Sequence, residues 1–220
     1  MKKKILYIVN LDKFFVSHRL PIACAIKNLG FEVHIAAKLT DYASILKKNG
    51  FTLHNLEIER GSISIISNII TFVKIFKLIF TIRPNLLHLI TIKPILFGSI
   101  ISYFFHDIST VASISGLGHV FSDKGKDSSL TKKFIIQIYK LALMNKKNKI
   151  IFQNKEDQKK LMNISNLNEN NLKLISGSGV DLKTFIPKNN KIDPPVVLFA
   201  GRLLISKGII DFIEAAKYIR

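Results

Sequence analysis

The sequence predicts an α/β fold with a doubly wound parallel sheet, and two features of the chain support this prediction. Apolar runs of strand length alternate with helical patterns along most of the chain, and these runs contain few polar residues. Continuous apolar runs are typical of strands that helices cover on both faces. Regular alternation of strands and helices favours right-handed crossovers within one sheet. With 220 residues and 48% hydrophobic residues, the chain can form one large domain, or one domain and part of another.

Seven strands and six helices are expected before residue 188. The strands cover Lys4 to Val9, Glu32 to Ala37, Thr52 to Leu56, Leu86 to Ile90, Thr110 to Ile114, Lys149 to Gln153 and Leu172 to Ile175. The helices cover His18 to Leu29, Asp41 to Asn49, Ser64 to Thr81, Pro94 to Phe105, Ser129 to Lys146 and Lys155 to Asn163. The first apolar run is too short for a signal peptide and lacks a small-residue cleavage site, so it is interpreted as a strand.

A polar stretch with two adjacent prolines, Lys188 to Pro195, indicates a domain boundary. After it the pattern restarts with an expected strand at Val196 to Ala200, a loop at Gly201 to Lys207 and a helix at Gly208 to Ile219. We therefore expect a domain over residues 1–187, a linker over residues 188–195, and the first βα unit of a second domain over residues 196–220.

The chain is strongly basic, with 33 Lys and Arg against 15 Asp and Glu, which gives a net charge of +18. Such a surplus favours polyanionic partners such as nucleic acid, anionic membrane or phosphorylated small molecules. The alternative is a genome whose codon usage favours lysine, isoleucine and asparagine. Cys24 is the single cysteine, which excludes a disulfide framework or a thiolate metal site and favours a reducing compartment.

Three interpretations of the apolar segment Ile65 to Ile82 stay open. It approaches the roughly 20 residues that cross a bilayer, but its lysines would lie near the middle of the span, where charges are unfavourable. Its polar residues recur at helical spacing and form one narrow stripe: Ser64, Ser67, Asn68, Thr71, Lys74, Lys77 and Thr81. We expect a buried crossover helix, with a membrane-surface helix and a transmembrane helix as alternatives.

Ligands of open parallel sheets bind beyond the carboxyl ends of the strands, where loops and helix N-termini meet. This rule selects five candidate loops: Asn10 to Arg19, Thr91 to Pro94, Ser115 to Ser122, Ser176 to Asp181 and Gly201 to Lys207. No dinucleotide fingerprint follows the first strand and no P-loop is present, so a nicotinamide dehydrogenase is not expected. Since the sequence shows no carboxylate pair, Ser-His-Asp arrangement or metal-spaced cluster, any activity would rely on positioning and charge stabilisation.

Two of these loops carry residues suited to an anionic ligand. In the loop from Ser115 to His119 the two glycines allow close backbone approach, and His119 could donate to a phosphate, although an ordinary glycine turn would look the same. Arg202 and Lys207 bracket a strand-to-helix turn, where they suit a diphosphate. Two exposed cations of a basic protein are the alternative.

His18 and Arg19 are expected to open the first helix, where a cation is unfavourable unless an anion lies nearby. His88 lies inside the fourth expected strand and is interpreted as a core histidine, with a place at the floor of a site as the alternative. The other histidines outside the glycine loop, His34, His54 and His106, are interpreted as structural or surface residues.

Four motifs occur in order along the chain. They are FVSHRLPIA at Phe15 to Ala23, SGLGHVF at Ser115 to Phe121, ISGSGVD at Ile175 to Asp181 with Phe185 and Pro187, and VLFAGRL at Val197 to Leu203 with Lys207 and Gly208. Together they resemble family 4 retaining glycosyltransferases of the GT-B fold, particularly the branch that builds bacterial capsule, O-antigen and lipid-linked oligosaccharides.

The resemblance implies two Rossmann-like domains that face each other across a cleft, with the nucleotide-diphosphate sugar held mainly by the second and the acceptor by the first. It implies no metal and no cofactor. The implied catalytic residues are Arg202 and Lys207, which match the basic pair that neutralises the leaving diphosphate. The implied donor-binding residues are Gly177, Gly179, Asp181, Gly201, Arg202 and Lys207. The implied acceptor-side residues are His18, Arg19, Ser115, Gly116, Gly118 and His119.

The chain departs from the family pattern in two ways. Many relatives carry a histidine just after the fifth strand, where this chain has Ser115, with His119 four residues later. The acidic motif of the family, two glutamates that contact the donor, would lie beyond Arg220, and a complete second domain would need roughly another 100 to 150 residues. We therefore expect a fragment or an interrupted gene product, with little or no transfer activity on its own.

The leading hypothesis is the acceptor-binding part of a glycosyltransferase that moves a hexose or N-acetylhexosamine from a nucleotide sugar to a polyprenyl-diphosphate-linked glycan. It places the protein in the cytoplasm, peripheral on an anionic membrane surface at the inner face of the bacterial cytoplasmic membrane, without nucleic acid. One alternative is a noncatalytic basic Rossmann-like module that binds nucleic acid or a protein partner. Another is an integral membrane protein anchored by Ile65 to Ile82.

Overall fold

The computed structural model describes residues 2–59, 64–116, 129–145, 148–164, 167–187 and 194–219, without the side chains of residues 129–135 and 164. The chain divides into two compact units, Met1–Gly179 and Val180–Arg220. The expected linker over residues 188–195 lies mostly outside the described residues. The expected domain boundaries therefore stay a prediction.

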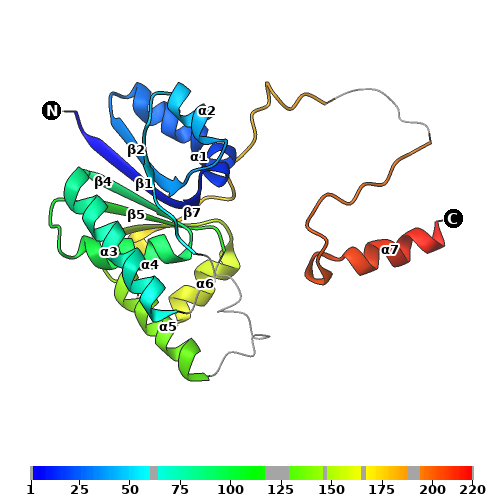
Figure 1. Ribbon diagram of the computed structural model, residues 1–220. Coiled ribbons are helices and arrows are strands. Elements are labelled where there is room, and N and C mark those ends of the chain that lie inside the picture. Colours follow the sequence, from blue (N-terminus) through cyan, green and yellow to red (C-terminus); the bar gives the residue numbers. More distant parts are fainter. Residues whose placement is uncertain are drawn as a thin grey trace. The chain divides into compact units, whose positions relative to one another are not determined.

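The first unit is built on one seven-stranded sheet (Figure 1), in which all the strand pairs are parallel and the order is β3-β2-β1-β4-β5-β6-β7. The strands are β1 (Lys4–Leu11), β2 (Glu32–Lys38), β3 (Thr52–Asn55), β4 (Leu86–Ile90), β5 (Ser109–Ile114), β6 (Asn148–Phe152) and β7 (Leu172–Leu174). The predicted α/β fold with a doubly wound parallel sheet is confirmed, and so are the seven expected strands.

Helices cover both faces of the sheet. They are α1 (Asp12–Asn28), α2 (Ala43–Lys48), α3 (Ile65–Ile82), α4 (Ile92–Ser102), α5 (Ser129–Leu143) and α6 (Lys155–Ile164), and a 3₁₀ turn, η2 (Glu169–Asn171), precedes β7. Figure 1 shows α1 and α2 on one face and α3 to α6 on the other. Ile5, Tyr7 and Val9 of β1 belong to the core beside α1, and Leu6 and Ile8 belong to the opposite core. Successive side chains of a strand point to opposite faces, so burial on both faces explains why β1 is a continuous apolar run.

Helix α1 begins at Asp12, six residues before the expected start at His18. Residues Asn10 to Arg19 do not form the expected loop, because β1 runs to Leu11 and the helix follows at once. The Asp12 carboxylate is fully buried and accepts hydrogen bonds from Lys13 N and Thr40 Oγ1, both at 2.7 Å, which ties the helix start to the end of β2. His18 and Arg19 therefore lie in the second turn, and the prediction that they open the helix is wrong.

The second unit contains a 3₁₀ turn, η3 (Ile205–Lys207), and the helix α7 (Ile209–Tyr218), which confirms the helix expected there. The strand expected over Val196 to Ala200 is wrong, because this stretch has no regular structure. The side chains of Val196, Val197 and Leu198 are 67–79% exposed. A strand is stable only when it pairs with a neighbour, and none of the described strands pairs with this stretch.

Gly98 lies in α4 at the point where this helix packs on β4. A Cβ atom at Gly98 would lie 2.8 Å from Leu89 Cδ1 and closer still to Leu89 Cδ2. Both residues are buried, so neither can move into solvent. The close approach of α4 to the sheet therefore depends on the missing side chain.

The Gly98→Ala variant is expected to lose about 1–3 kcal/mol of unfolding free energy, because the added methyl group overpacks the contact with Leu89. Leu89→Ala alone leaves a cavity and is expected to lose about 2–5 kcal/mol. The double variant should be more stable than the sum of the two losses implies, since it removes the collision. Urea unfolding followed by circular dichroism measures all three variants. Strictly additive losses would show that these two groups do not collide.

Candidate functional site

The carboxyl ends of β1 and β4 meet at the point where the strand order reverses. From β1 the chain continues to β2 on one side, and from β4 it continues to β5 on the other. Parallel α/β sheets bind their ligands in the crevice that such a reversal leaves open. Asn10 lies near the end of β1 and Thr91 directly after β4, and Thr91 Oγ1 donates a hydrogen bond of 2.7 Å to Asn10 Oδ1. This bond joins the two strand ends at the reversal.

Thr91 has a strained backbone, with φ 74° and ψ 161°. A β-branched residue in this region is unfavourable by about 1–3 kcal/mol, and such strain clusters at functional sites. Thr91 is also the residue before the first turn of α4, and its side chain makes no capping hydrogen bond to that turn. The hydroxyl is instead committed to Asn10. The first amides of α4 are thus left without a side-chain acceptor from Thr91 at the crevice.

Arg19 joins two distant motifs at the same edge of the sheet. Its Nη1 donates a hydrogen bond of 3.2 Å to Ser178 Oγ, across 159 residues of sequence. Ser178 lies between Gly177 at φ 75° and Gly179 at φ 69°, both in the left-handed region. No atom lies within 4 Å of the Cβ position at either glycine, so the backbone conformation, and not space, favours glycine there. The expected acceptor-side residue Arg19 thus contacts the segment that carries Gly177 and Gly179.

Beneath Arg19 lies a buried polar cluster formed by Tyr7 and His88. Their rings are 4.9 Å apart, and the Tyr7 ring also contacts Phe15 at 5.1 Å. Tyr7 Oη and Arg19 Nε are both buried and have no hydrogen-bond partner among the described residues. Burial raises the pKa of the Tyr7 phenol, and the Arg19 charge opposes this shift in part. Burial also lowers the pKa of the Arg19 guanidinium, while Tyr7 raises it.

His88 is a buried histidine with a polar partner. Its Nε2 shares a hydrogen bond of 2.7 Å with Ser113 Oγ of β5. Burial first, and then the Arg19 charge, lower the pKa of His88 to about 3. The imidazole is therefore neutral at physiological pH and is unsuited to donate or receive a proton as a catalyst. The prediction of a satisfied core histidine is confirmed, and its neighbours Tyr7 and Arg19 place it below the candidate site.

Three of the remaining acceptor-side candidates, His18, Ser115 and Gly116, are at the surface. His18 is exposed, its ring stacks on Phe14 at 4.3 Å, and its Nδ1 shares a hydrogen bond of 2.6 Å with Ser17 Oγ. Ser115 and Gly116 follow β5 and are exposed. The other two candidates of this loop, Gly118 and His119, lie outside the described residues. The roles expected for all these residues stay predictions.

The donor-side candidates Gly201, Arg202 and Lys207 are exposed in the second unit. Arg202 O accepts a hydrogen bond of 2.8 Å from Leu204 N, and Gly208, at φ 77°, links η3 to α7. In the part of the chain that the structure describes, no carboxylate pairs with Arg202 or Lys207. Both cations therefore have their charge available to an anion.

Asp181 is the acidic donor-side candidate, and its carboxylate accepts hydrogen bonds within a local turn. Asp181 Oδ1 accepts a hydrogen bond of 2.9 Å from Lys183 N, and Oδ2 accepts one of 2.9 Å from Thr184 Oγ1. The Lys183 amide first, and then the Thr184 hydroxyl, lower the pKa of this exposed carboxyl. These hydrogen bonds stabilise the turn that follows Gly179. The donor contact expected for Asp181 stays a prediction.

Reasoning from the sequence missed three members of the candidate site: Tyr7, Thr91 and Ser178. Tyr7 is one aromatic residue in an apolar strand, so no pattern distinguishes it. Ser178 lies inside the ISGSGVD motif, of which only the glycines and Asp181 were expected to bind a ligand. Thr91 lies in one of the five candidate loops, but its backbone strain is not visible in the sequence. Among the described residues, no three His, Cys, Asp or Glu side chains gather as a metal site would require.

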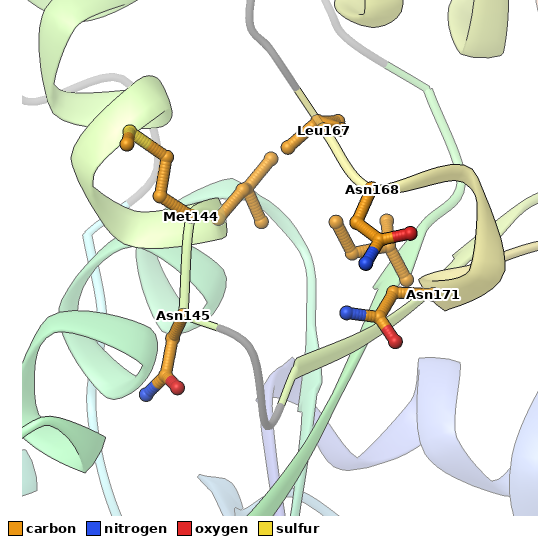
Figure 2. Close-up of a pocket in the computed structure, with 7 residues that line it drawn as sticks. Met144, Asn145, Leu167, Asn168 and Asn171 are labelled. Carbon is orange, nitrogen blue, oxygen red and sulfur yellow. The ribbon is translucent and has the colours of Figure 1, made fainter.

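One hollow of the first unit lies at the opposite edge of the sheet (Figure 2). It has a volume of about 220 Å³ and lies where the chain enters β6 and β7. Its lining is apolar or amide: Leu143, Met144, Asn145, Ile150, Leu167, Asn168 and Asn171. Because this described lining has no ionisable side chain, the hollow has no group suited to charge stabilisation.

The seven-stranded parallel sheet and its helices match the N-terminal Rossmann-like domain of the GT-B fold. The chain belongs to the glycosyl transferase 4-like family, which it matches over residues 4–154.

Among curated proteins, the chain is similar to the N,N'-diacetylbacillosaminyl-diphospho-undecaprenol alpha-1,3-N-acetylgalactosaminyltransferase of Campylobacter jejuni, with 26% identity over 215 residues. The match covers 92% of this chain and 57% of that enzyme, so the chain spans little more than half the length of this relative.

Solved structures agree on the fold. Sucrose-phosphate synthase of Thermosynechococcus elongatus superposes with a TM-score of 0.66 at 16% identity, over 99% of this chain and 60% of that one. A glycosyltransferase of Rickettsia africae gives 0.59 at 17% identity, over 86% and 46%. HepE of Anabaena, in complex with UDP-glucose, gives 0.54 at 13% identity, over 82% and 45%. At these identities the structures support the fold alone.

The Tyr7→Phe variant is expected to keep or raise the unfolding free energy, because it removes a buried hydroxyl that has no described partner. Tyr103→Phe is the matched control, since Tyr103 Oη donates a hydrogen bond of 2.8 Å to Leu141 O. This control is expected to lose about 0.5–1.5 kcal/mol. Urea unfolding measures both. A loss at Tyr7→Phe as large as that of the control would show that the Tyr7 hydroxyl is satisfied.

Proposed function

We propose that this chain provides the acceptor-binding part of a glycosyltransferase that moves a hexose or N-acetylhexosamine from a nucleotide-diphosphate sugar to a polyprenyl-diphosphate-linked glycan. The observation that carries the proposal is the Arg19–Ser178 contact at the carboxyl edge of the sheet, above a buried and incompletely paired Tyr7. The name of the Campylobacter jejuni relative, a transferase acting on a diphospho-undecaprenol-linked sugar, supports the acceptor class.

Arg19 is the group suited to the diphosphate of such an acceptor. Among the described residues, its Nε has no partner, and the guanidinium donates from Nη1 to the neutral Ser178 hydroxyl. A guanidinium presents its donors in a planar fork that matches phosphate oxygens. Because Arg19 is partly buried, an anion bound beside it would be screened less by water than at an exposed lysine.

In the proposed transfer, the bond between the anomeric carbon and the donor diphosphate breaks, and the acceptor hydroxyl oxygen bonds to that carbon. The hydroxyl proton passes to the leaving diphosphate. Negative charge grows on the diphosphate as this bond breaks, because the oxygen keeps the electron pair, until the proton arrives; Arg202 and Lys207 are the cations proposed to stabilise it. Asp181, Gly177 and Gly179 would shape the segment that leads toward the donor. The UDP-glucose bound by HepE, a protein of similar fold, supports a nucleotide sugar as donor.

The proposed acceptor sits in a membrane, so we propose that the protein works at the inner face of the bacterial cytoplasmic membrane, as a peripheral protein. The net charge of +18 fits an anionic lipid surface. The role in capsule or O-antigen synthesis belongs to the same proposal.

Arg19→Ala is expected to weaken binding of a polyprenyl-diphosphate-linked disaccharide about tenfold or more, because it removes a charge-assisted contact to phosphate. Microscale thermophoresis in detergent micelles measures the binding. Lys149→Ala is the charge-matched control, since Lys149 Nζ is bound to Asn171 Oδ1 at 2.7 Å near the amino edge of the sheet. If both variants bind the glycan equally weakly, the effect comes from the net charge of the protein, and a binding site at Arg19 is contradicted.

Arg202→Ala and Lys207→Ala are each expected to weaken binding of UDP, the probe nucleotide, about tenfold, because each removes a cation without a described ion-pair partner. Isothermal titration calorimetry measures the affinity. Lys217→Ala is the control in the same unit, since Lys217 Nζ already pairs with Glu214 at 2.7 Å. If the control loses as much affinity as the two variants, the basic pair is not a donor site.

A noncatalytic basic module that binds nucleic acid is the second candidate, and the net charge favours it. It predicts binding to unrelated RNA that falls steeply with salt, and no response to the lipid-linked glycan. An RNA competitor in the Arg19 experiment separates the two functions. Displacement of the glycan by RNA at physiological salt would favour the nucleic-acid module.

A further inference from the structure

Helix α3 exposes a continuous apolar surface. Seven of its side chains, 37–75% exposed, form what we call the α3 outer face: Ile65, Ile66, Ile69, Ile70, Val73, Phe76 and Phe80. They recur at spacings of three and four residues, so they lie along one side of the helix. The exposed Phe104 extends this surface, because its ring lies 6.5 Å from that of Phe76. The apolar surface thus continues beyond the helix itself.

Helix α3 packs on the sheet through the residues of its inner side. Its buried residues are Thr71, Ile75, Ile79 and Ile82, and three of them belong to the core beneath α4. Helix α3 does connect β3 to β4, as expected of a crossover helix, but the expectation that it is buried is wrong, because only 22% of Ile65–Ile82 is buried. The burial of Thr71 also places part of the expected polar stripe inside. The apolar residues opposite are not members of that core, although the Phe76 ring lies 5.7 Å from the ring of its member Phe105. Single exposed apolar side chains are ordinary, whereas a contiguous patch marks an interaction surface.

Cations border the α3 outer face. Lys74 is exposed four residues after Ile70, and Lys77 is exposed between Val73 and Phe80 on the helix surface. Arg83 lies over the Phe80 ring at 4.5 Å and over the Phe105 ring at 4.9 Å. Residues 64–106 contain Lys74, Lys77, Arg83 and Lys93 but no Asp or Glu. Long basic side chains beside apolar residues can reach lipid headgroups while their stems stay on the apolar surface.

We propose that the α3 outer face docks on an anionic lipid bilayer, with its isoleucine and phenylalanine side chains at the headgroup boundary and Lys74, Lys77 and Arg83 against lipid phosphates. Helix α3 then lies along the membrane surface and does not cross it, because its inner side remains in the protein core. A second copy of the chain is the less favourable occupant, since two chains of charge +18 would repel.

The docking surface deepens the proposed function, since it would bring the acceptor-binding domain to its lipid-linked substrate. Its evidence is nevertheless separate, because α3 is on the opposite face of the sheet from α1, which carries Arg19. Binding to lipid alone therefore tests the surface without any sugar or nucleotide.

The test is flotation of the whole chain with vesicles of phosphatidylcholine alone, or with an equal amount of phosphatidylglycerol. The wild type is expected to float with the anionic vesicles and only weakly with the neutral ones. A triple variant with Ile66→Ser, Ile69→Ser and Val73→Ser is expected to lose about tenfold or more in partitioning, because it removes apolar side chains from the surface. A double variant with Lys74→Gln and Lys77→Gln is expected to lose the preference for anionic lipid.

Controls keep the result interpretable. A variant with Leu29→Ser and Ile45→Ser removes exposed apolar side chains outside α3 and is expected to bind vesicles like the wild type. Circular dichroism and urea unfolding of each variant exclude loss of fold. Flotation of the triple variant equal to that of the wild type would overturn the proposal, as would equal binding of the wild type to neutral and anionic vesicles.

Three further outcomes would also overturn it. If alkaline carbonate leaves the vesicle-bound protein in the membrane, α3 is inserted across the bilayer and not lying on it. If sedimentation shows a dimer that the triple variant abolishes, and vesicles do not bind, a second copy covers the face. If the wild-type chain does not bind vesicles but binds the lipid-linked glycan in detergent, the docking surface is refuted and the proposed function stands.

Discussion

The structure depends on burial of the central strand β1 on both of its faces. Tyr7 on one side and Ile8 on the other belong to separate hydrophobic clusters, so one short strand contributes to two cores. This constraint places the neighbouring helices: α1 must cover one face, and α3 and α4 must cover the other. The alternation of crossovers then makes the strand order reverse beside β1, where Asn10 and Thr91 meet.

Two buried polar groups near these strand ends are unfavourable for stability, because they have no described hydrogen-bond partner. Tyr7 Oη and Arg19 Nε are enclosed without described partners, although buried polar groups are normally satisfied. Thr91 keeps a backbone conformation that most residues avoid. Three departures from ordinary stability rules thus occur near the carboxyl ends of β1 and β4. The amino edge, with its amide-lined hollow, shows no comparable ionisable group among its described lining residues.

The sequence predicts the strands well because each one is an uninterrupted apolar run that only two-sided burial explains. It predicts the start of α1 poorly, because Asp12 is held by Thr40 of another strand end, a contact that no local pattern records. It fails at Val196 to Ala200, since an apolar run becomes a strand only beside a neighbour. The Arg19–Ser178 contact spans 159 residues and could not be read from spacing, although both motifs were recognised.

The distance along the chain between paired strands has a consequence for biosynthesis. β1 first meets β2, which follows soon after it, but its other neighbour β4 pairs through contacts such as Lys4 N to Asn85 Oδ1, 81 residues apart. On the ribosome, one edge of the most apolar strand is therefore left open until β4 has been translated. Such non-local parallel pairing folds slowly and exposes strand edges to aggregation. The nascent chain is accordingly expected to be a client of chaperones during this interval.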